Sequence, residues 1–141
     1  MIAVDTNVLL YATDTGSAVS DPAHAAVRRL VETGGVWGIP WPVAGEFVAQ
    51  LTGPRVRLPP EQALGPLDWW LTEGGAHLLG ETPQTYERFR ALVVAGGTRG
   101  VRVHDARIAA ICLANGVAEF WTADRDYLRF PDLRVRNPLV G

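Results

Sequence analysis

Apolar and polar positions along the chain form two kinds of pattern: short, mostly apolar runs and longer stretches with helical periodicity. The short runs predict strands at residues 1–4, 36–40, 76–79, 118–122 and 133–137. The longer stretches predict helices at residues 7–14, 21–35, 42–53, 61–75, 82–97 and 104–116. Strands that alternate with helices are typical of an α/β domain, in which helices cover both faces of a mostly parallel sheet.

Proline and glycine mark the ends of several predicted helices. Asp21 followed by Pro22 predicts an N-cap and a first helical residue, and the same pattern recurs at Thr82 and Pro83. A glycine–proline pair in the middle of the helix over residues 61–75 predicts a break or a kink.

Length and composition narrow the class of protein. With 141 residues, no internal repeat and no long linker, we expect one domain over residues 1–141. No apolar run approaches the roughly 18 residues of a membrane span, and the apolar start lacks the basic region of a signal peptide. The single cysteine excludes an internal disulfide and a cysteine zinc site, so we expect a cytoplasmic protein that does not enter a membrane.

Four carboxylates stand where the predicted elements would bring them together. Asp5 directly follows the first strand, and Asp124 comes two residues after the end of the fourth. Ligands of open parallel sheets collect at the carboxyl ends of the strands. At about 100° per residue, Asp105 projects inward from the start of the last helix. On the same reasoning, Glu46 flanks the apolar stripe of the third helix.

Each acid alone has an ordinary structural explanation. Asp105 and Asp124 could cap helices and satisfy first-turn N–H groups. Glu46 could be a solvated helix residue. Asp5 is harder to explain in this way, because a carboxylate at a buried strand end needs a partner.

The acids taken together point to a metal site. Carboxylates that meet in one cleft repel each other unless a cation lies between them. Oxygen ligands without a cysteine cluster or a close histidine pair suit Mg²⁺ or Mn²⁺ rather than zinc. Such a site suits phosphodiester hydrolysis, because a bound metal lowers the pKa of water and neutralises charge on the phosphate.

Four stretches resemble, in order, the four motifs of PIN-domain ribonucleases, and in particular those of the VapC toxins of bacterial toxin–antitoxin pairs. They are AVDTNVLLYA, GEFV, VHDARIAAICLANGV and WTADRDYLRF, and together they extend over essentially the whole chain. The resemblance implies a Rossmann-like three-layer α/β/α fold and a Mg²⁺- or Mn²⁺-dependent endoribonuclease acting on RNA. It also implies a homodimer and neutralisation by a VapB-type antitoxin.

The resemblance also assigns roles to matching positions. The implied catalytic acids are Asp5, Glu46, Asp105 and Asp124, of which the metal ligands would be Asp5, Asp105 and Asp124. A second tier of residues would support them: Thr6, Asn7, Thr122 and Asp126. Asn7 would orient Asp5 or steady the turn, and Thr122 would do the same beside Asp124. Asp126 could be an outer acid or a structural residue.

Basic and aromatic residues leave alternatives open. The net charge of −2 argues against nucleic-acid binding by bulk electrostatics, and all 13 basic residues are arginines. Arg99 and Arg102, predicted in a glycine-flanked loop, could bind RNA phosphates or lie on a solvated surface. The Trp69–Trp70 pair matches no family motif; we expect packing in the core or a dimer, with base stacking as the alternative.

Two other functional classes fit the sequence less well than the nuclease does. A PIN-like module that only binds RNA or protein would not need all four acids. A phosphotransfer domain with Asp5 as nucleophile would usually carry a second acid beside it or a lysine, whereas this chain has Thr6 and Asn7 there and no lysine. The sequence therefore favours a metal-dependent endoribonuclease.

Overall fold

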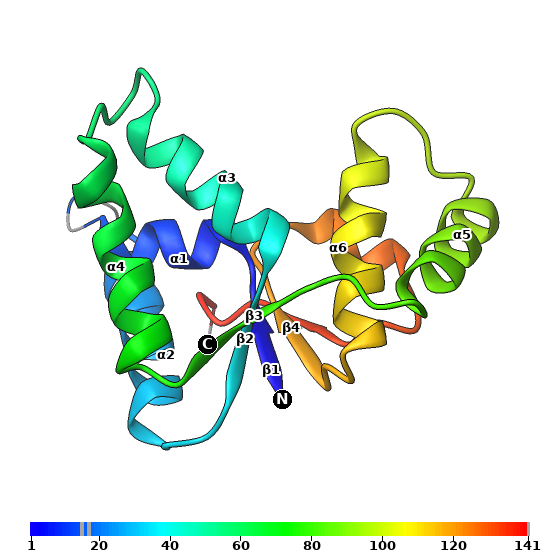
Figure 1. Ribbon diagram of the computed structural model, residues 1–141, viewed down its shortest axis with the longest axis horizontal. Helices are drawn as coiled ribbons and strands as arrows, with labels where there is room; N and C mark the ends of the chain where they lie inside the picture. Colours follow the sequence, from blue (N-terminus) through cyan, green and yellow to red (C-terminus); the bar gives the residue numbers. More distant parts are fainter. Residues whose placement is uncertain (15, 17, 141) are drawn as a thin grey trace.

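A five-stranded parallel sheet forms the centre of the computed structural model, which describes residues 1–14, 16 and 18–140 (Figure 1). Its strand order is β3-β2-β1-β4-β5, and every pair of neighbours is parallel. The strands are β1 (Ile2–Val4), β2 (Trp37–Pro40), β3 (Ala76–Leu79), β4 (Glu119–Trp121) and β5 (Val135–Arg136). The predicted α/β class with a mostly parallel sheet is confirmed.

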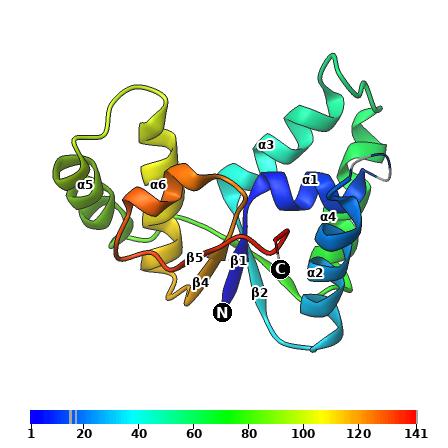
Figure 2. The same cartoon turned by 180° about the vertical axis from the view of Figure 1, so that it is seen from behind.

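Helices cover both faces of this sheet. They are α1 (Thr6–Thr13), α2 (Ser20–Glu32), α3 (Trp41–Thr52), α4 (Pro60–Thr72), α5 (Thr85–Gly96), α6 (Arg102–Ala114) and the short 3₁₀-helix η1 (Arg125–Arg129). Both views place α1 to α4 on one side of the sheet and α5, α6 and η1 on the other (Figures 1 and 2). This is the three-layer α/β/α arrangement. Among the described residues, no helix has both the length and the apolar character needed to cross a membrane.

The central strand β1 lies in the middle of the core. It pairs with β2 on one side and with β4 on the other, where Val4 stands opposite Trp121. Ala3 and Val4 are fully buried because helices cover both faces of the strand. A strand in this position is apolar throughout, which explains why the first residues of the chain show no alternation.

The tryptophan pair in α4 divides between core and surface. Trp70 is buried and packs edge-to-face against Trp37 and Phe47, with ring centroids 6.2 Å and 5.6 Å away. Trp69 is 51% exposed. Core packing is therefore confirmed for Trp70 alone, and Trp69 remains available for a surface role.

Two predicted helix starts are wrong. Helix α2 begins at Ser20, so Asp21 lies in the first turn and is not the N-cap. Helix α5 begins at Thr85, after a turn in which the Thr82 N–H donates to the Thr85 hydroxyl (2.8 Å) and the Thr85 N–H donates to the Thr82 carbonyl (3.0 Å). In both cases the sequence pattern locates the start of the helix but not its first residue.

Two further details of the helices differ from expectation. Helix α6 begins at Arg102, after Gly100 with its positive φ of 63°, so Arg102 is a helical residue and its predicted loop position is wrong. Helix α4 continues through Pro66 without a break. The buried residues Ala63 and Leu67 lie on either side of this proline and hold both halves of α4 against the core.

Candidate metal centre

The carboxyl ends of β1 and β4 lie side by side, and each delivers an aspartate to the same edge of the sheet. The Asp5 N–H donates to the Trp121 carbonyl (2.9 Å), which extends the ladder by one residue beyond β1. Asp124 follows β4 and serves as the N-cap of η1. Asp105 lies in the first turn of α6, and Glu46 lies in α3. The four predicted acids therefore come from four separate elements.

Asp5 is buried and held by three donors. Its Oδ1 accepts from the Thr6 N–H (2.8 Å), and its Oδ2 accepts from the Thr122 hydroxyl (2.6 Å) and the Asn7 side-chain amide (3.3 Å). Burial raises the pKa of Asp5 to about 6, even though the hydrogen bonds from Thr122 and Thr6 lower it. The charges of Glu46 and Asp124 raise it further, so these carboxylates influence one another directly.

Thr122 and Asn7 join the ends of the two strands. The Thr122 hydroxyl accepts from the Asp124 N–H (3.0 Å) and from the Asn7 amide (3.3 Å) while it donates to Asp5. The Asn7 side-chain oxygen accepts from the Ala123 N–H (3.1 Å). Thr122 and Asn7, which were predicted to support the acids, thus contact both Asp5 and the segment that carries Asp124.

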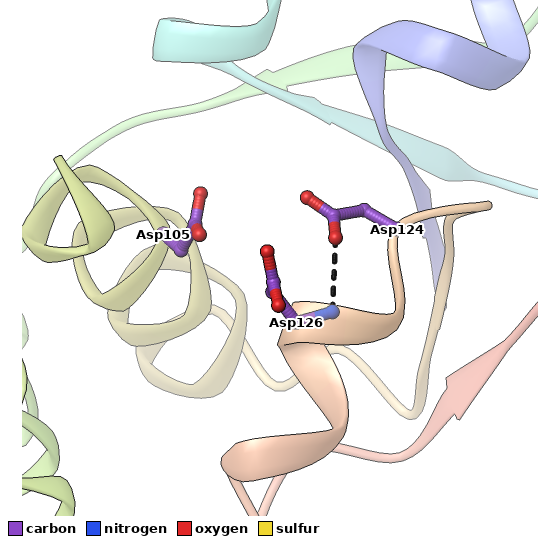
Figure 3. Close-up of side chains that lie close together, drawn as sticks. All are labelled: Asp105, Asp124 and Asp126. Atoms are coloured by element: carbon purple, nitrogen blue, oxygen red, sulfur yellow. Dashed lines mark hydrogen bonds between the residues drawn. The ribbon is translucent and has the colours of Figure 1, made fainter.

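Three aspartates form the tightest acidic group at this edge. One carboxylate oxygen from each of Asp105, Asp124 and Asp126 lies within 4.8 Å of the others. Figure 3 shows their side chains directed toward a common space, with Asp105 on α6 and the other two at the start of η1. The Asp126 N–H donates to Asp124 Oδ1 (2.9 Å), so Asp124 caps η1 and still presents a carboxylate to the cluster. Capping and a functional role are therefore compatible at this position.

The electrostatics of the site reflect this crowding. Partial burial, followed by the charges of Asp124 and Asp126, raises the pKa of Asp105. Desolvation and the charges of Asp105 and Asp124 raise the pKa of Glu46, so the acids of α3 and α6 lie near one another. Each carboxylate thus raises the pKa of its neighbours, which makes this edge of the sheet strongly negative.

Asp126 differs from its neighbours because it has a cationic partner. Its Oδ2 lies 2.5 Å from the Arg102 guanidinium, which lowers the pKa of the Asp126 carboxyl. The charge of Arg102 also acts on Asp105, where it offsets part of the rise in pKa that burial and the neighbouring carboxylates cause. The sequence did not reveal this ion pair. Arg102 and Asp126 are 24 positions apart, and only the packing of η1 against α6 brings them together.

The donor set fits a hard divalent ion. The clustered oxygens of Asp105, Asp124 and Asp126 match the oxygen ligands that Mg²⁺ and Mn²⁺ prefer. The Thr6 hydroxyl is buried beside the Glu46 carboxylate, and its interaction with that group lowers the pKa of Glu46. The expected ligand set of Asp5, Asp105 and Asp124 overlaps this group in two members. Asp5, whose oxygens accept from Thr6 and Thr122, remains a predicted ligand, because each carboxylate oxygen has a second lone pair.

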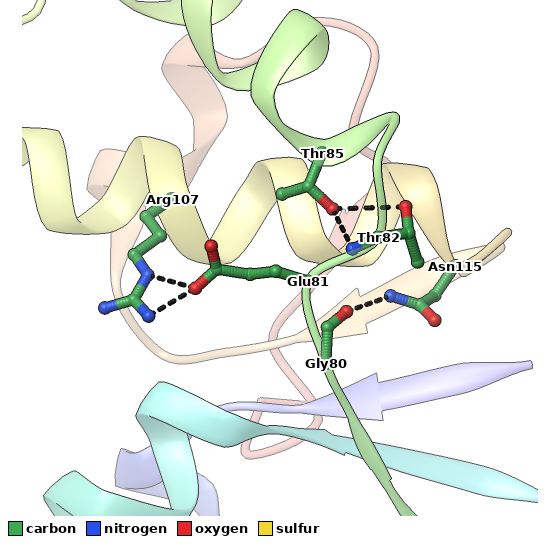
Figure 4. A network of polar contacts seen from close by, with 6 residues as sticks. All are labelled: Gly80, Glu81, Thr82, Thr85, Arg107 and Asn115. Atoms are coloured by element: carbon green, nitrogen blue, oxygen red, sulfur yellow. Dashed lines mark hydrogen bonds and ion pairs between the residues drawn. The ribbon is translucent and has the colours of Figure 1, made fainter.

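A polar network behind α6 helps to set the position of Asp105 (Figure 4). The Arg107 Nε donates to Glu81 Oε1 (2.9 Å), and the Asn115 side-chain amide donates to the Gly80 carbonyl (2.9 Å). These contacts join two points along α6 to the segment that follows β3.

Arg99, the other arginine predicted to bind substrate, lies exposed in the loop between α5 and α6.

Asp5→Asn should change how the stability of the metal-free protein depends on pH. The folded protein holds the Asp5 proton with a pKa of about 6, against 3.8 for an unperturbed aspartate. Ionisation of Asp5 therefore destabilises the folded state as pH rises from about 4 to about 7, by about 2.4 kcal/mol in total. The free energy of unfolding of the wild type, relative to Asp5→Asn, should fall by this amount over that range.

Urea denaturation in the presence of a chelator, at pH 4 and pH 7.5, measures this difference. Asp68→Asn is the matched control, since it makes the same chemical change on the exposed surface of α4. Its unfolding at the same two pH values gives the baseline with which Asp5→Asn is compared. A wild-type to Asp5→Asn difference that does not change with pH would contradict the raised pKa.

Comparison with known proteins supports the family suggested by the motifs. The PIN domain family model matches residues 2–133. Ribonuclease VapC48 from Mycobacterium tuberculosis is 29% identical over 140 residues, which cover 97% of each chain. Ribonuclease VapC43 from the same species is 31% identical over 144 residues, which cover 100% of this chain and 97% of the relative.

A solved structure shares the fold. VapBC2 from Rickettsia felis, bound to a DNA fragment from their promoter, contains a chain that matches with a TM-score of 0.71 at 19% identity. The match covers 97% of this chain and 98% of that one, and at this identity it is evidence of fold alone. With the family model and the VapC relatives extending over nearly the whole sequence, the chain belongs to the PIN-domain family and to its VapC ribonuclease branch.

Proposed function

We propose that this chain is a Mg²⁺- or Mn²⁺-dependent endoribonuclease, with residues 1–141 forming one PIN domain, and that it is the toxin of a toxin–antitoxin pair. The observation that carries the proposal is the group of three aspartates, with Asp5 and Glu46 beside it, at the carboxyl edge of a parallel sheet. The relatives named as ribonucleases support the same activity.

The residues of the site divide the chemistry between them. Asp105, Asp124 and Asp126 would hold the divalent ion, which supplies a bound water of lowered pKa and neutralises charge on the scissile phosphate. Glu46 faces this space from α3 with a raised pKa, which suits a group that accepts the proton of the attacking water. Asp5, whose orientation Thr122 and Asn7 fix, would be a further metal ligand, as the family resemblance implies.

Arg99 and Arg102 would bind phosphates of the RNA strand. Arg99 is exposed in the loop that precedes α6, and Arg102 begins that helix next to the acids. Arginines beside an acidic site can bind the RNA backbone locally although the net charge of the chain is −2.

A VapB-type antitoxin and a second copy of the chain are the proposed protein partners. The Rickettsia felis structure is of a VapBC pair, which supports an antitoxin partner for this chain. The homodimer is proposed from the family resemblance.

RNA cleavage should require the divalent ion and the acids. Metal-stripped protein should leave purified total RNA intact, and added Mg²⁺ or Mn²⁺ should restore fragments. Asp124→Asn and Asp5→Asn should each lower the rate at least about 100-fold, whereas Asp68→Asn should cleave like the wild type. No cleavage by folded, antitoxin-free protein across transfer, ribosomal and messenger RNA would favour a binding module without turnover.

The arginine substitutions should weaken substrate binding more than turnover. Arg99→Gln and Arg102→Gln should each raise KM for RNA, with a kcat that changes far less, because the variant no longer pairs with an RNA phosphate while the acids remain. The salt dependence of log KM should also become shallower by about 0.7 for each phosphate that is no longer neutralised. Arg90→Gln, on α5, removes the same charge and should leave KM unchanged. An equal rise in KM for all three variants would indicate a bulk charge effect.

Co-expression tests the antitoxin proposal. The chain should co-purify with the product of the small reading frame adjacent to its gene, and that complex should cleave RNA more slowly than the chain alone. A neighbouring product that neither binds nor inhibits the chain would contradict the toxin role and leave the nuclease proposal standing.

A further inference from the structure

Arg102 is the cation that contacts the acidic cluster in the described part of the chain. Its guanidinium lies 2.5 Å from Asp126 Oδ2, and the side chains of the two residues are 40% and 41% exposed. Arg102 begins α6 and stands three residues before Asp105, so the two share one face of the first turn. Arg102 thus reaches from α6 to η1, on the side of the helix that carries a clustered acid.

This position gives the cluster a counter-charge of its own. Three carboxylates with oxygens within 4.8 Å of one another repel strongly unless a positive charge is near. Arg102 interacts electrostatically with all three of them, and most directly with Asp126. In the protein without a divalent ion, Arg102 therefore supplies part of the positive charge that holds η1 and α6 together.

The same contact draws on a carboxylate that a bound metal would also use. Asp126 belongs to the group that would hold the ion, yet one of its oxygens is already paired with Arg102. The pair is open to solvent, and half-exposed ion pairs of this kind are weak enough to exchange partners. Asp5 is the opposite case, because buried donors hold both of its oxygens.

We propose that Arg102 is an exchangeable counter-ion for Asp126, which pairs with this carboxylate in the metal-free protein, competes with the divalent ion for it, and is released when the ion binds. The proposal rests on the metal-dependent function proposed above. Arg102 is in this sense a positioning residue for the metal centre, and its release makes the guanidinium available to an RNA phosphate.

A double-mutant cycle on Mn²⁺ affinity, measured without RNA, tests this exchange. Electron paramagnetic resonance of free Mn²⁺ gives the Kd for the wild type, Arg102→Gln, Asp126→Asn and the double variant. Arg102→Gln should tighten Mn²⁺ binding about threefold to tenfold, because the competitor is gone. In the Asp126→Asn background, the same substitution should tighten binding clearly less, because only the interaction of Arg102 with Asp105 and Asp124 is then lost.

Control variants separate exchange from bulk charge. Arg90→Gln removes one positive charge from α5, which carries none of the clustered acids, and should leave the Mn²⁺ Kd unchanged. Arg102→Lys retains the charge and should bind Mn²⁺ with an affinity between those of the wild type and Arg102→Gln. Thermal unfolding of each variant with and without Mn²⁺ confirms that the compared proteins are folded.

The outcomes distinguish the two proposals. Tightening of similar size in both backgrounds would show that Arg102 acts only through space, which overturns the exchange. Unchanged affinity in Arg102→Gln would overturn it as well. Absence of Mn²⁺ binding in the folded wild type would instead overturn the metal-dependent function, and the exchange with it.

Discussion

The structure depends on the placement of negative charge at the carboxyl ends of β1 and β4. A carboxylate buried at the end of a central strand costs free energy unless donors surround it. The Thr6 N–H, the Thr122 hydroxyl and the Asn7 amide are these donors, and they join β1 to the segment after β4. These bonds hold Asp5 in place, and the Thr122 hydroxyl also accepts from the Asp124 N–H, which links Asp124 to the same network.

The cluster is then assembled by elements that approach this edge from one side of the sheet. Helix α6 brings Asp105, and η1 brings Asp126 within reach of it. The position of α6 depends on contacts away from the acids, where Arg107 pairs with Glu81 and Asn115 binds the Gly80 carbonyl. A site whose geometry must be held within fractions of an ångström relies on such supporting contacts.

Two kinds of carboxylate result from this arrangement. Asp5 is buried, fixed by hydrogen bonds and shifted toward neutrality. Asp126 is half-exposed, paired with Arg102 and shifted toward ionisation. Burial of one aspartate and a cationic partner beside the other thus shift the pKa values of two chemically identical groups in opposite directions.

The fold class and the succession of the main elements could be predicted from the chain alone, because periodicity and motif order are local properties. The environment of each acid could not, because it depends on contacts between distant elements. Whether Asp126 or Asp5 completes the tight group depends on oxygen positions within a few ångströms, and these are set by the packing of η1 against α6. The contact of Arg102 with Asp126 and the exposure of Trp69 beside buried Trp70 have the same origin, because no local pattern specifies which distant surface a side chain meets.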